Sequence, residues 1–133
     1  MGFSGLPSLE THGLPFSVGI DIVEIERIRQ AVDTQAERFL RKVFSPEEIS
    51  LCLGRADSMA CLAARFAAKE AFKKAIRSSI PVAWRDIAIL PVSDGGPALR
   101  LVSSVGERLG GNFVLSLSHS RDYAVAVVIW ETG

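Results

Sequence analysis

The sequence predicts an α+β fold, in which a small antiparallel sheet packs on one long central helix. Residues 65–77 contain four alanines and neither glycine nor proline, so their helix propensity is high. Two pairs of strand-like segments, each joined by a short turn, predict two β-hairpins. The 133 residues suffice for one domain with a real core. We expect a flexible leader over residues 1–15 and a single domain over residues 16–133.

The composition excludes several classes of function. Hydrophobic residues make up 48% and charged residues 23% of the chain, as in ordinary soluble proteins. Fifteen basic and fifteen acidic residues give no net charge, so we expect no nucleic-acid partner, and any basic function must be local. No apolar run approaches the length of a membrane span. The two cysteines, Cys52 and Cys61, are expected to be free buried thiols in a reducing cytoplasm. With only His12 and His119 beside them, a structural zinc site is not expected.

The first ordered element is predicted at residues 16–23, where β-branched residues favour a short buried strand. Asp21 lies inside this apolar run, and a bare buried carboxylate is costly unless it is paired or bound to a metal. It could cap the next helix, pair with Arg27, or bind a metal ion. Residues 24–32 and 35–43 are predicted to form two helices, of which the second is strongly basic.

A third helix is predicted to begin at Ser-Pro-Glu-Glu, where Ser45 is the N-cap and Glu48 closes a capping box. The remaining elements follow the long helix in order. They are strands at 84–90 and 98–102, a short helix at 103–109, and strands at 113–118 and 123–130, with His119 at the tip of the last hairpin.

One broad arc of the long helix carries mostly methyl groups, which allows another element to pack close to its backbone: Ala67, Ala68, Ala71, Phe72 and Ala75. The charged residues fall elsewhere on the helix. Arg65, Lys69 and Lys73 follow one another at intervals of four and predict a basic stripe. Glu70 and Lys74 lie between this stripe and the apolar arc.

This charge pattern has two interpretations. It is typical of a solvated face, with an ion pair between Glu70 and Lys74 worth a few tenths of a kcal/mol. Alternatively, the cations hold a polyphosphate and Glu70 holds a divalent metal. Magnesium usually takes one or two protein carboxylates together with water and substrate phosphates, so a second acid must come from elsewhere. His119 is similarly open: it is either a surface residue or, with Ser118 and Arg121 beside it, a phosphate contact.

Three motifs occur in order: Gly-Ile-Asp-Ile at 19–22 with Glu-Arg-Ile at 26–28, Arg-Phe-Ala-Ala-Lys-Glu-Ala-Phe-Lys-Lys-Ala at 65–75, and Leu-Ser-His-Ser at 117–120. Together they resemble holo-acyl-carrier-protein synthase, the small bacterial type of 4′-phosphopantetheinyl transferase. The resemblance runs from about residue 17 to residue 130 and includes Trp-Arg-Asp-Ile at 84–87. The loop Ile-Arg-Ser-Ser-Ile-Pro at 76–81 departs from the glycine-rich turn usual in the family.

The resemblance implies a phosphopantetheinyl transferase-like fold and an Mg²⁺-dependent transferase of fatty acid biosynthesis. The enzyme would move the 4′-phosphopantetheine arm of coenzyme A to a serine of apo acyl carrier protein and release adenosine 3′,5′-bisphosphate. Asp21 and Glu70 would bind the metal, and Lys74 would lie against the transferring phosphate. Either Glu70 or a water on the metal would accept the serine proton.

The remaining site residues also come from the resemblance. Coenzyme A would be held by Lys74 together with Arg65, Lys69, Ser118 and His119. Arg27 would face the acidic carrier protein. The family further implies a cytoplasmic homotrimer whose sites lie between subunits, with Asp21 and Glu70 from one subunit and His119 from its neighbour.

Two rival functions use the same residues differently. A magnesium-dependent phosphohydrolase would use the two carboxylates on a nucleotide and release phosphate. A non-catalytic module would bind acidic proteins through the basic second helix and would need no metal.

Overall fold

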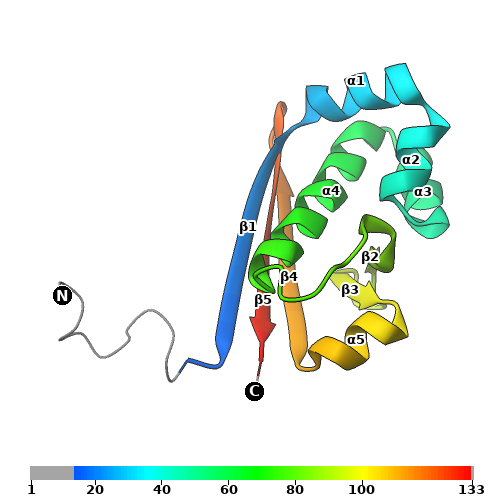
Figure 1. Cartoon of the computed structure of the whole chain (residues 1–133). Helices are drawn as coiled ribbons and strands as arrows, with labels where there is room; N and C mark the ends of the chain where they lie inside the picture. The colour runs from blue at the N-terminus through cyan, green and yellow to red at the C-terminus, as the bar shows by residue number, and fades with distance from the viewer. Residues whose placement is uncertain (1–13, 133) are drawn as a thin grey trace, which may run out of the picture.

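The computed structural model describes residues 14–132 and arranges them around helix α4 (Figure 1). Most of the predicted leader, with His12, lies outside the described residues. The elements in chain order are β1 (Phe16–Glu24), α1 (Ile25–Gln35), α2 (Glu37–Val43), α3 (Pro46–Leu53), α4 (Ser58–Ala75), the 3-10 turn η1 (Trp84–Asp86), β2 (Ile87–Pro91), β3 (Pro97–Leu101), α5 (Ser103–Leu109), β4 (Asn112–His119) and β5 (Tyr123–Glu131).

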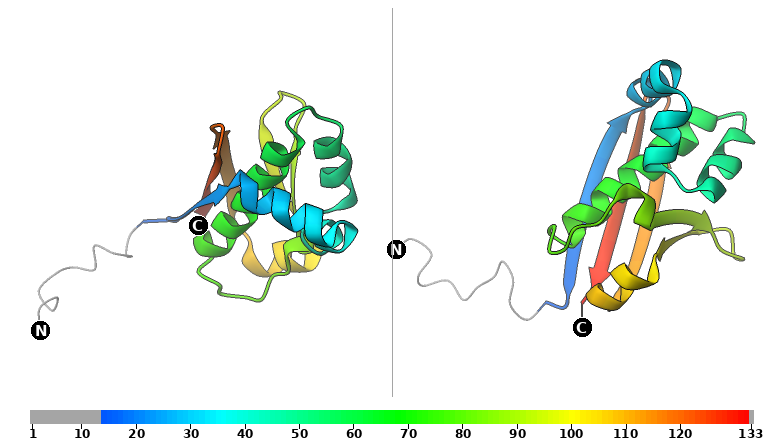
Figure 2. Two further views of the ribbon diagram at one scale, coloured as in Figure 1. Left: turned by 90° about the horizontal axis from the view of Figure 1, so that it is seen from above. Right: turned by 45° about the vertical axis from the view of Figure 1, so that its right-hand side comes forward.

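The strands form two antiparallel sheets. One has the order β1-β5-β4 and the other is the β2-β3 hairpin. Helix α4 lies across one face of the three-stranded sheet, while α1, α2 and α3 gather at one end of the molecule and α5 lies at the other (Figures 1 and 2). The predicted α+β fold and both hairpins are confirmed. The first hairpin begins later than predicted, because residues 84–86 form the turn η1 rather than strand.

The alanine arc of α4 is buried as predicted, because β1 and β5 cover it. Ala67, Ala71 and Ala75 have no exposed surface. A side chain at Gly19 would overlap the carbonyl of Ala71 and would lie 2.7 Å from the backbone nitrogen of Ala75. Only glycine therefore fits where β1 crosses this helix, and the small residues on both elements set how closely strand and helix approach.

Strand β1 differs from the buried strand that the sequence predicted. Successive side chains of a strand point to opposite faces, and only one face of β1 meets α4. Val18, Ile20 and Ile22 are about 60% exposed on the other face. We define the outer sheet face as these three residues with the apolar residues that lie in register on β5 and β4, namely Val125, Val127, Ile129 and Val114. It is a continuous apolar surface that no described element covers.

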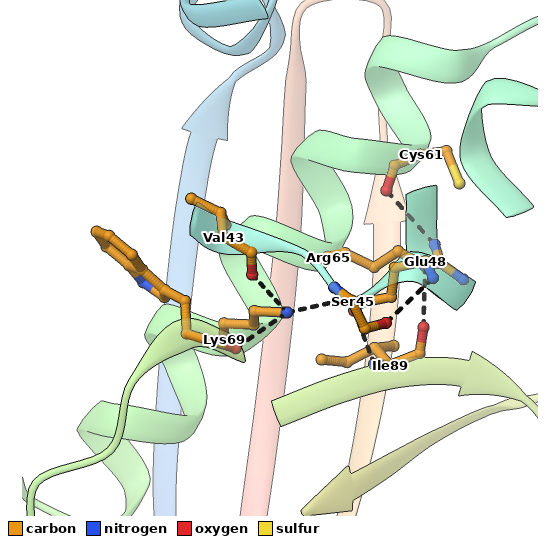
Figure 3. A network of polar contacts seen from close by, with 8 residues as sticks. Val43, Ser45, Glu48, Cys61, Arg65, Lys69 and Ile89 are labelled. Carbon is orange, nitrogen blue, oxygen red and sulfur yellow. Dashed lines mark hydrogen bonds and ion pairs between the residues drawn. The ribbon is translucent and has the colours of Figure 1, made fainter. Parts of the chain in front are cut away.

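The predicted basic stripe on α4 is wrong for Lys69, which is completely buried. Its ammonium group donates to Glu48 Oε1 at 2.7 Å and to the carbonyls of Val43 at 2.7 Å and Trp84 at 3.1 Å (Figure 3). Three donors thus have three acceptors inside the chain. Burial lowers the pKa of Lys69, although the neighbouring Glu48 carboxylate acts in the opposite direction.

Arg65, another predicted member of the stripe, is also largely buried. Its guanidinium donates to the carbonyls of Ile89 at 3.0 Å and Cys61 at 3.4 Å (Figure 3). Burial lowers the pKa of Arg65 below its ordinary value. A helical wheel places both residues on one side of α4, but it cannot reveal that α3 and β2 cover that side.

Glu48 connects these elements. The predicted capping box is present, because Ser45 Oγ accepts from Glu48 N at 3.1 Å and Glu48 Oε1 accepts from Ser45 N at 2.9 Å. The same carboxylate accepts from Ile89 N at 2.8 Å through Oε2. The residue that closes the cap of α3 therefore also ties this helix to Lys69 of α4 and to β2.

The two cysteines form a disulfide, with Cα atoms of Cys52 and Cys61 5.4 Å apart. The expectation of free thiols is therefore wrong. The sequence offered no Cys-x-x-Cys signal, and the pairing arises from the short turn that brings the end of α3 beside the start of α4.

Among residues 14–132, no helix is long and apolar enough to cross a membrane.

Candidate active site

Asp21 lies near the middle of β1, and its side chain is 18% exposed. The ammonium of Lys74, from the last turn of α4, lies 3.1 Å from Asp21 Oδ1 and donates to the carbonyl of Ile20 at 3.0 Å. Lys74 therefore pairs with Asp21, in place of the predicted ion pair with Glu70. Asp21 pairs with neither Arg27 nor the start of α1, the two structural alternatives raised by the sequence.

Glu70 lies one helical turn before Lys74 on α4. Its Oε2 accepts a hydrogen bond from the indole Nε1 of Trp84 at 2.6 Å. Asp21 and Glu70 line the same cavity of about 370 Å³, and Arg27 of α1 lies on its wall. The strand and the helix therefore bring two acids far apart in the sequence to one cavity, beside the predicted carrier-docking residue.

The residues in this cavity fit a magnesium ion. Asp21 already has a cation beside it, the Lys74 ammonium, which a second positive charge could replace. Two carboxylates match the usual protein contribution to an Mg²⁺ site, whose other ligands are water and substrate phosphates. Among the described residues, no group of three or more His, Cys, Asp and Glu side chains is placed to hold a metal. Water and substrate oxygens would therefore complete the coordination of a metal bound here.

A second cavity, of about 290 Å³, is lined in part by three of the residues predicted to contact coenzyme A: Arg65, Ser118 and His119. His119 ends β4, and its Nε2 lies 3.7 Å from Asp57 Oδ2. Its Nδ1 lies 3.0 Å from the carbonyl of Ser120. The His119 side chain is 43% exposed, so the imidazole is open to a ligand.

Within one chain the two cavities share no lining residue. Asp21 on β1 pairs in register with Ala126, and His119 on β4 pairs with Ala124, so strand β5 separates them. The structure thus brings together Asp21, Glu70 and Lys74 on one side of the sheet. His119 lies at the opposite edge strand.

Sequence reasoning missed two residues that shape the site. Trp84 contacts Glu70 directly, yet a single tryptophan in a sequence carries no signal of its hydrogen-bond partner. Glu48 was recognised only as a cap, because its contact with Lys69 joins segments 21 residues apart.

Comparison with known proteins identifies the family. A family model described as the 4′-phosphopantetheinyl transferase superfamily matches residues 17–128. The holo-[acyl-carrier-protein] synthase of Chlamydia pneumoniae is 42% identical over 115 residues, which cover 84% of this chain and 93% of that protein. The synthase of Halothermothrix orenii is 39% identical over 121 residues, which cover 87% of this chain and 97% of that protein.

Solved structures agree with these sequence matches. The crystal structure of holo-[acyl-carrier-protein] synthase from Neisseria meningitidis matches with a TM-score of 0.80 at 30% identity, covering 86% of this chain and 97% of that one. The Helicobacter pylori synthase in complex with coenzyme A matches with a TM-score of 0.74 at 34% identity, and the match covers 84% of this chain and 96% of that one. The chain therefore belongs to the 4′-phosphopantetheinyl transferase superfamily, and it is a transferase of the holo-[acyl-carrier-protein] synthase type.

Proposed function

We propose that this chain transfers the 4′-phosphopantetheine group of coenzyme A to a serine of apo acyl carrier protein, as a step of fatty acid biosynthesis. The other product is adenosine 3′,5′-bisphosphate. The observation that carries the proposal is that Asp21 and Glu70 line one cavity, with the ammonium of Lys74 paired to Asp21. The relatives named as holo-[acyl-carrier-protein] synthases support the reaction, and the Helicobacter pylori structure supports coenzyme A as the donor.

Asp21 and Glu70 are the residues that would hold Mg²⁺. When bound, the ion would neutralise charge at the attacked phosphorus and on the leaving group. Lys74 is more than half exposed on a flexible stem, so its ammonium can leave Asp21 and reach the transferring phosphate. Glu70 is also the candidate base for the serine hydroxyl, because its carboxylate lies in the same cavity.

Coenzyme A phosphates would contact the second cavity through Arg65, Ser118 and His119. Arg65 lines it, and its fork of donors suits phosphate. Lys69 is left out of this set, since its three donors already bind Glu48, Val43 and Trp84 inside the chain. Because Lys69 is buried, we do not propose it as a coenzyme A contact, although the family resemblance implied one.

We further propose a homotrimer with each active site between two subunits. The outer sheet face supports this, because a large exposed apolar surface generally marks a contact with another chain. The separation of Asp21 from His119 across β5 gives each chain two incomplete halves. Closed symmetry would join the Asp21 half of one subunit to the His119 half of the next at every interface.

Arg27 is the proposed contact with the acidic carrier. It is exposed on α1 at the wall of the metal cavity. Neighbouring Arg29 pairs with Glu26 at 3.3 Å, whereas no ion pair engages Arg27 within the described chain. Exposed charges of this kind mainly set association rate and specificity.

We place the protein in the cytoplasm, although a disulfide is unusual in that compartment.

Incubation with coenzyme A, Mg²⁺ and an apo carrier protein tests the proposal, with intact mass spectrometry as the readout. We expect one phosphopantetheine added at the carrier serine and release of adenosine 3′,5′-bisphosphate. Free phosphate with an unmodified carrier would support the phosphohydrolase. Carrier binding that needs no metal and leaves the carrier unmodified would support the non-catalytic module.

A further inference from the structure

We propose that Trp84 is a positioning residue whose indole N–H orients the Glu70 carboxylate for the cation of this site. This inference rests on the proposed function, since it assumes that Glu70 is a metal ligand. The distance from Trp84 Nε1 to Glu70 Oε2 is 2.6 Å, a short contact, and hydrogen bonds to a charged acceptor are shorter and stronger than those between neutral groups. No other hydrogen bond engages the Glu70 side chain within residues 14–132.

Trp84 is itself held from two sides. Its carbonyl accepts from Lys69 Nζ at 3.1 Å, and that ammonium is fixed by the buried Glu48. Its ring lies 5.9 Å from the ring of Phe66, centroid to centroid, and Lys73 Nζ lies 4.5 Å from the ring centre. These contacts restrict where the indole can lie, and a chain of polar contacts runs from the core through Lys69 and Trp84 to Glu70.

The arrangement suits metal binding because a carboxylate has lone pairs for more than one partner. The indole uses one lone pair of Oε2, and Oε1 remains available for a cation. A glutamate on a helix surface otherwise samples several rotamers, and ordering them opposes binding. Outer-shell partners that orient a metal ligand commonly change metal affinity by about 10- to 100-fold when they are removed.

Trp84→Phe removes the indole N–H and keeps an aromatic ring beside Phe66 and Lys73. Mn²⁺ serves as the probe, because oxygen-rich sites for Mg²⁺ also accept it. We expect the Mn²⁺ dissociation constant of the whole protein, measured by electron paramagnetic resonance, to rise about 10-fold or more in this variant. Raising the metal concentration should restore kcat, which a misfolded site would not allow.

Trp130→Phe is the matched control. Its indole Nε1 also donates one hydrogen bond, to the carbonyl of Gly110 at 3.0 Å, but away from the carboxylates. We expect this variant to bind Mn²⁺ like the parent protein. Urea unfolding of both variants shows whether either has lost its fold.

Glu70→Gln separates failure of this inference from failure of the proposed function. Weak Mn²⁺ binding by both Glu70→Gln and Trp84→Phe supports the inference. Weak binding by Glu70→Gln with parental binding by Trp84→Phe overturns it and leaves the proposed site intact. Parental binding by Glu70→Gln overturns the proposed metal site itself.

A measurement on the parent protein tests the inference even if Trp84→Phe does not fold. The two indole N–H groups give separate signals in a proton–nitrogen correlation spectrum. Addition of Mg²⁺ should shift the Trp84 indole signal and leave that of Trp130 in place. In Glu70→Gln, the Trp84 signal should not shift. A Trp84 signal that does not respond while Mg²⁺ binds would overturn the inference.

Discussion

The Lys69 ammonium and the Glu48 carboxylate meet at 2.7 Å with both side chains fully buried. Lys69 comes from α4 and Glu48 from α3, and their other hydrogen bonds reach the end of α2, the turn η1 and strand β2. Such a pair is not a large net source of stability, because each charge loses its hydration. Removal of one partner alone is costly, because the other charge then stays buried without compensation.

Lys69→Met leaves the Glu48 carboxylate buried without its countercharge. We expect the free energy of unfolding to fall by about 3–5 kcal/mol, the usual consequence of breaking a buried pair. Urea denaturation followed by circular dichroism measures this change. Adding Glu48→Gln to the first substitution should recover part of the loss, since the uncompensated charge is then gone. Parental stability in the single variant would contradict the pairing.

Burial lowers the pKa of Lys69 from the ordinary 10.5, which gives stability a dependence on alkaline pH. Between the lowered pKa and 10.5, the folded protein has released this proton while the unfolded chain still holds it. Unfolding therefore takes up a proton, so the contribution of Lys69 to the free energy of unfolding rises with pH through this window. We expect the free energy of unfolding, measured by denaturation at a series of pH values, to have a more positive slope against pH in the parent protein than in Lys69→Met. An equal slope would place the lysine pKa at its ordinary value.

The disulfide between Cys52 and Cys61 should stabilise the fold by closing a short loop in the unfolded chain. The double substitution Cys52→Ser with Cys61→Ser should lower the free energy of unfolding by about 2–3 kcal/mol. Dithiothreitol should lower the free energy of unfolding of the parent protein by a similar amount and leave that of the double variant unchanged. Thiol titration of the denatured parent should find no free thiol. Two free thiols in protein taken directly from cells would mean that the pair stays reduced in the cytoplasm.

The outer sheet face is expected to hold the trimer together. Ile20→Glu puts a charge in the middle of the β1 row of this apolar surface, at a side chain that is 59% exposed in the single chain. We expect light scattering to find the parent as a trimer and this variant as a monomer with little transferase activity. Val92→Glu is the matched control, because Val92 is an exposed apolar residue at the β2-β3 turn, away from this face. A monomeric parent protein would exclude the proposed assembly.

The sequence predicted most local structure because local structure depends on local patterns. The Ser45 capping box and the alanine arc of α4 depend on residues a few positions apart, and both are confirmed. The family motifs also identified Asp21 and Glu70, which the structure places at one cavity. Whether they bind metal remains a prediction.

Apart from the disulfide, the main errors concern contacts between segments that are apart in the sequence. Lys69 was assigned to an exposed stripe because its spacing on α4 says nothing of the helix and strand that cover it. Ile20 was assigned to a buried strand because an apolar side chain does not reveal whether its partner lies in the same chain. The role of Trp84 was missed for the same reason, since its contact with Glu70 spans 14 residues.

The central claim is that transfer takes place at a site shared by two copies of this chain, with Asp21 from one and His119 from the other. Asp21→Ala and His119→Ala should each be nearly inactive alone. Co-expressed with different affinity tags and purified through both, they should form mixed trimers in which some interfaces carry both intact residues. Intact mass of the carrier after incubation with coenzyme A and Mg²⁺ should then reveal partly restored transfer. Verified mixed trimers whose activity stays at the level of the single variants would show that the site is built within one chain.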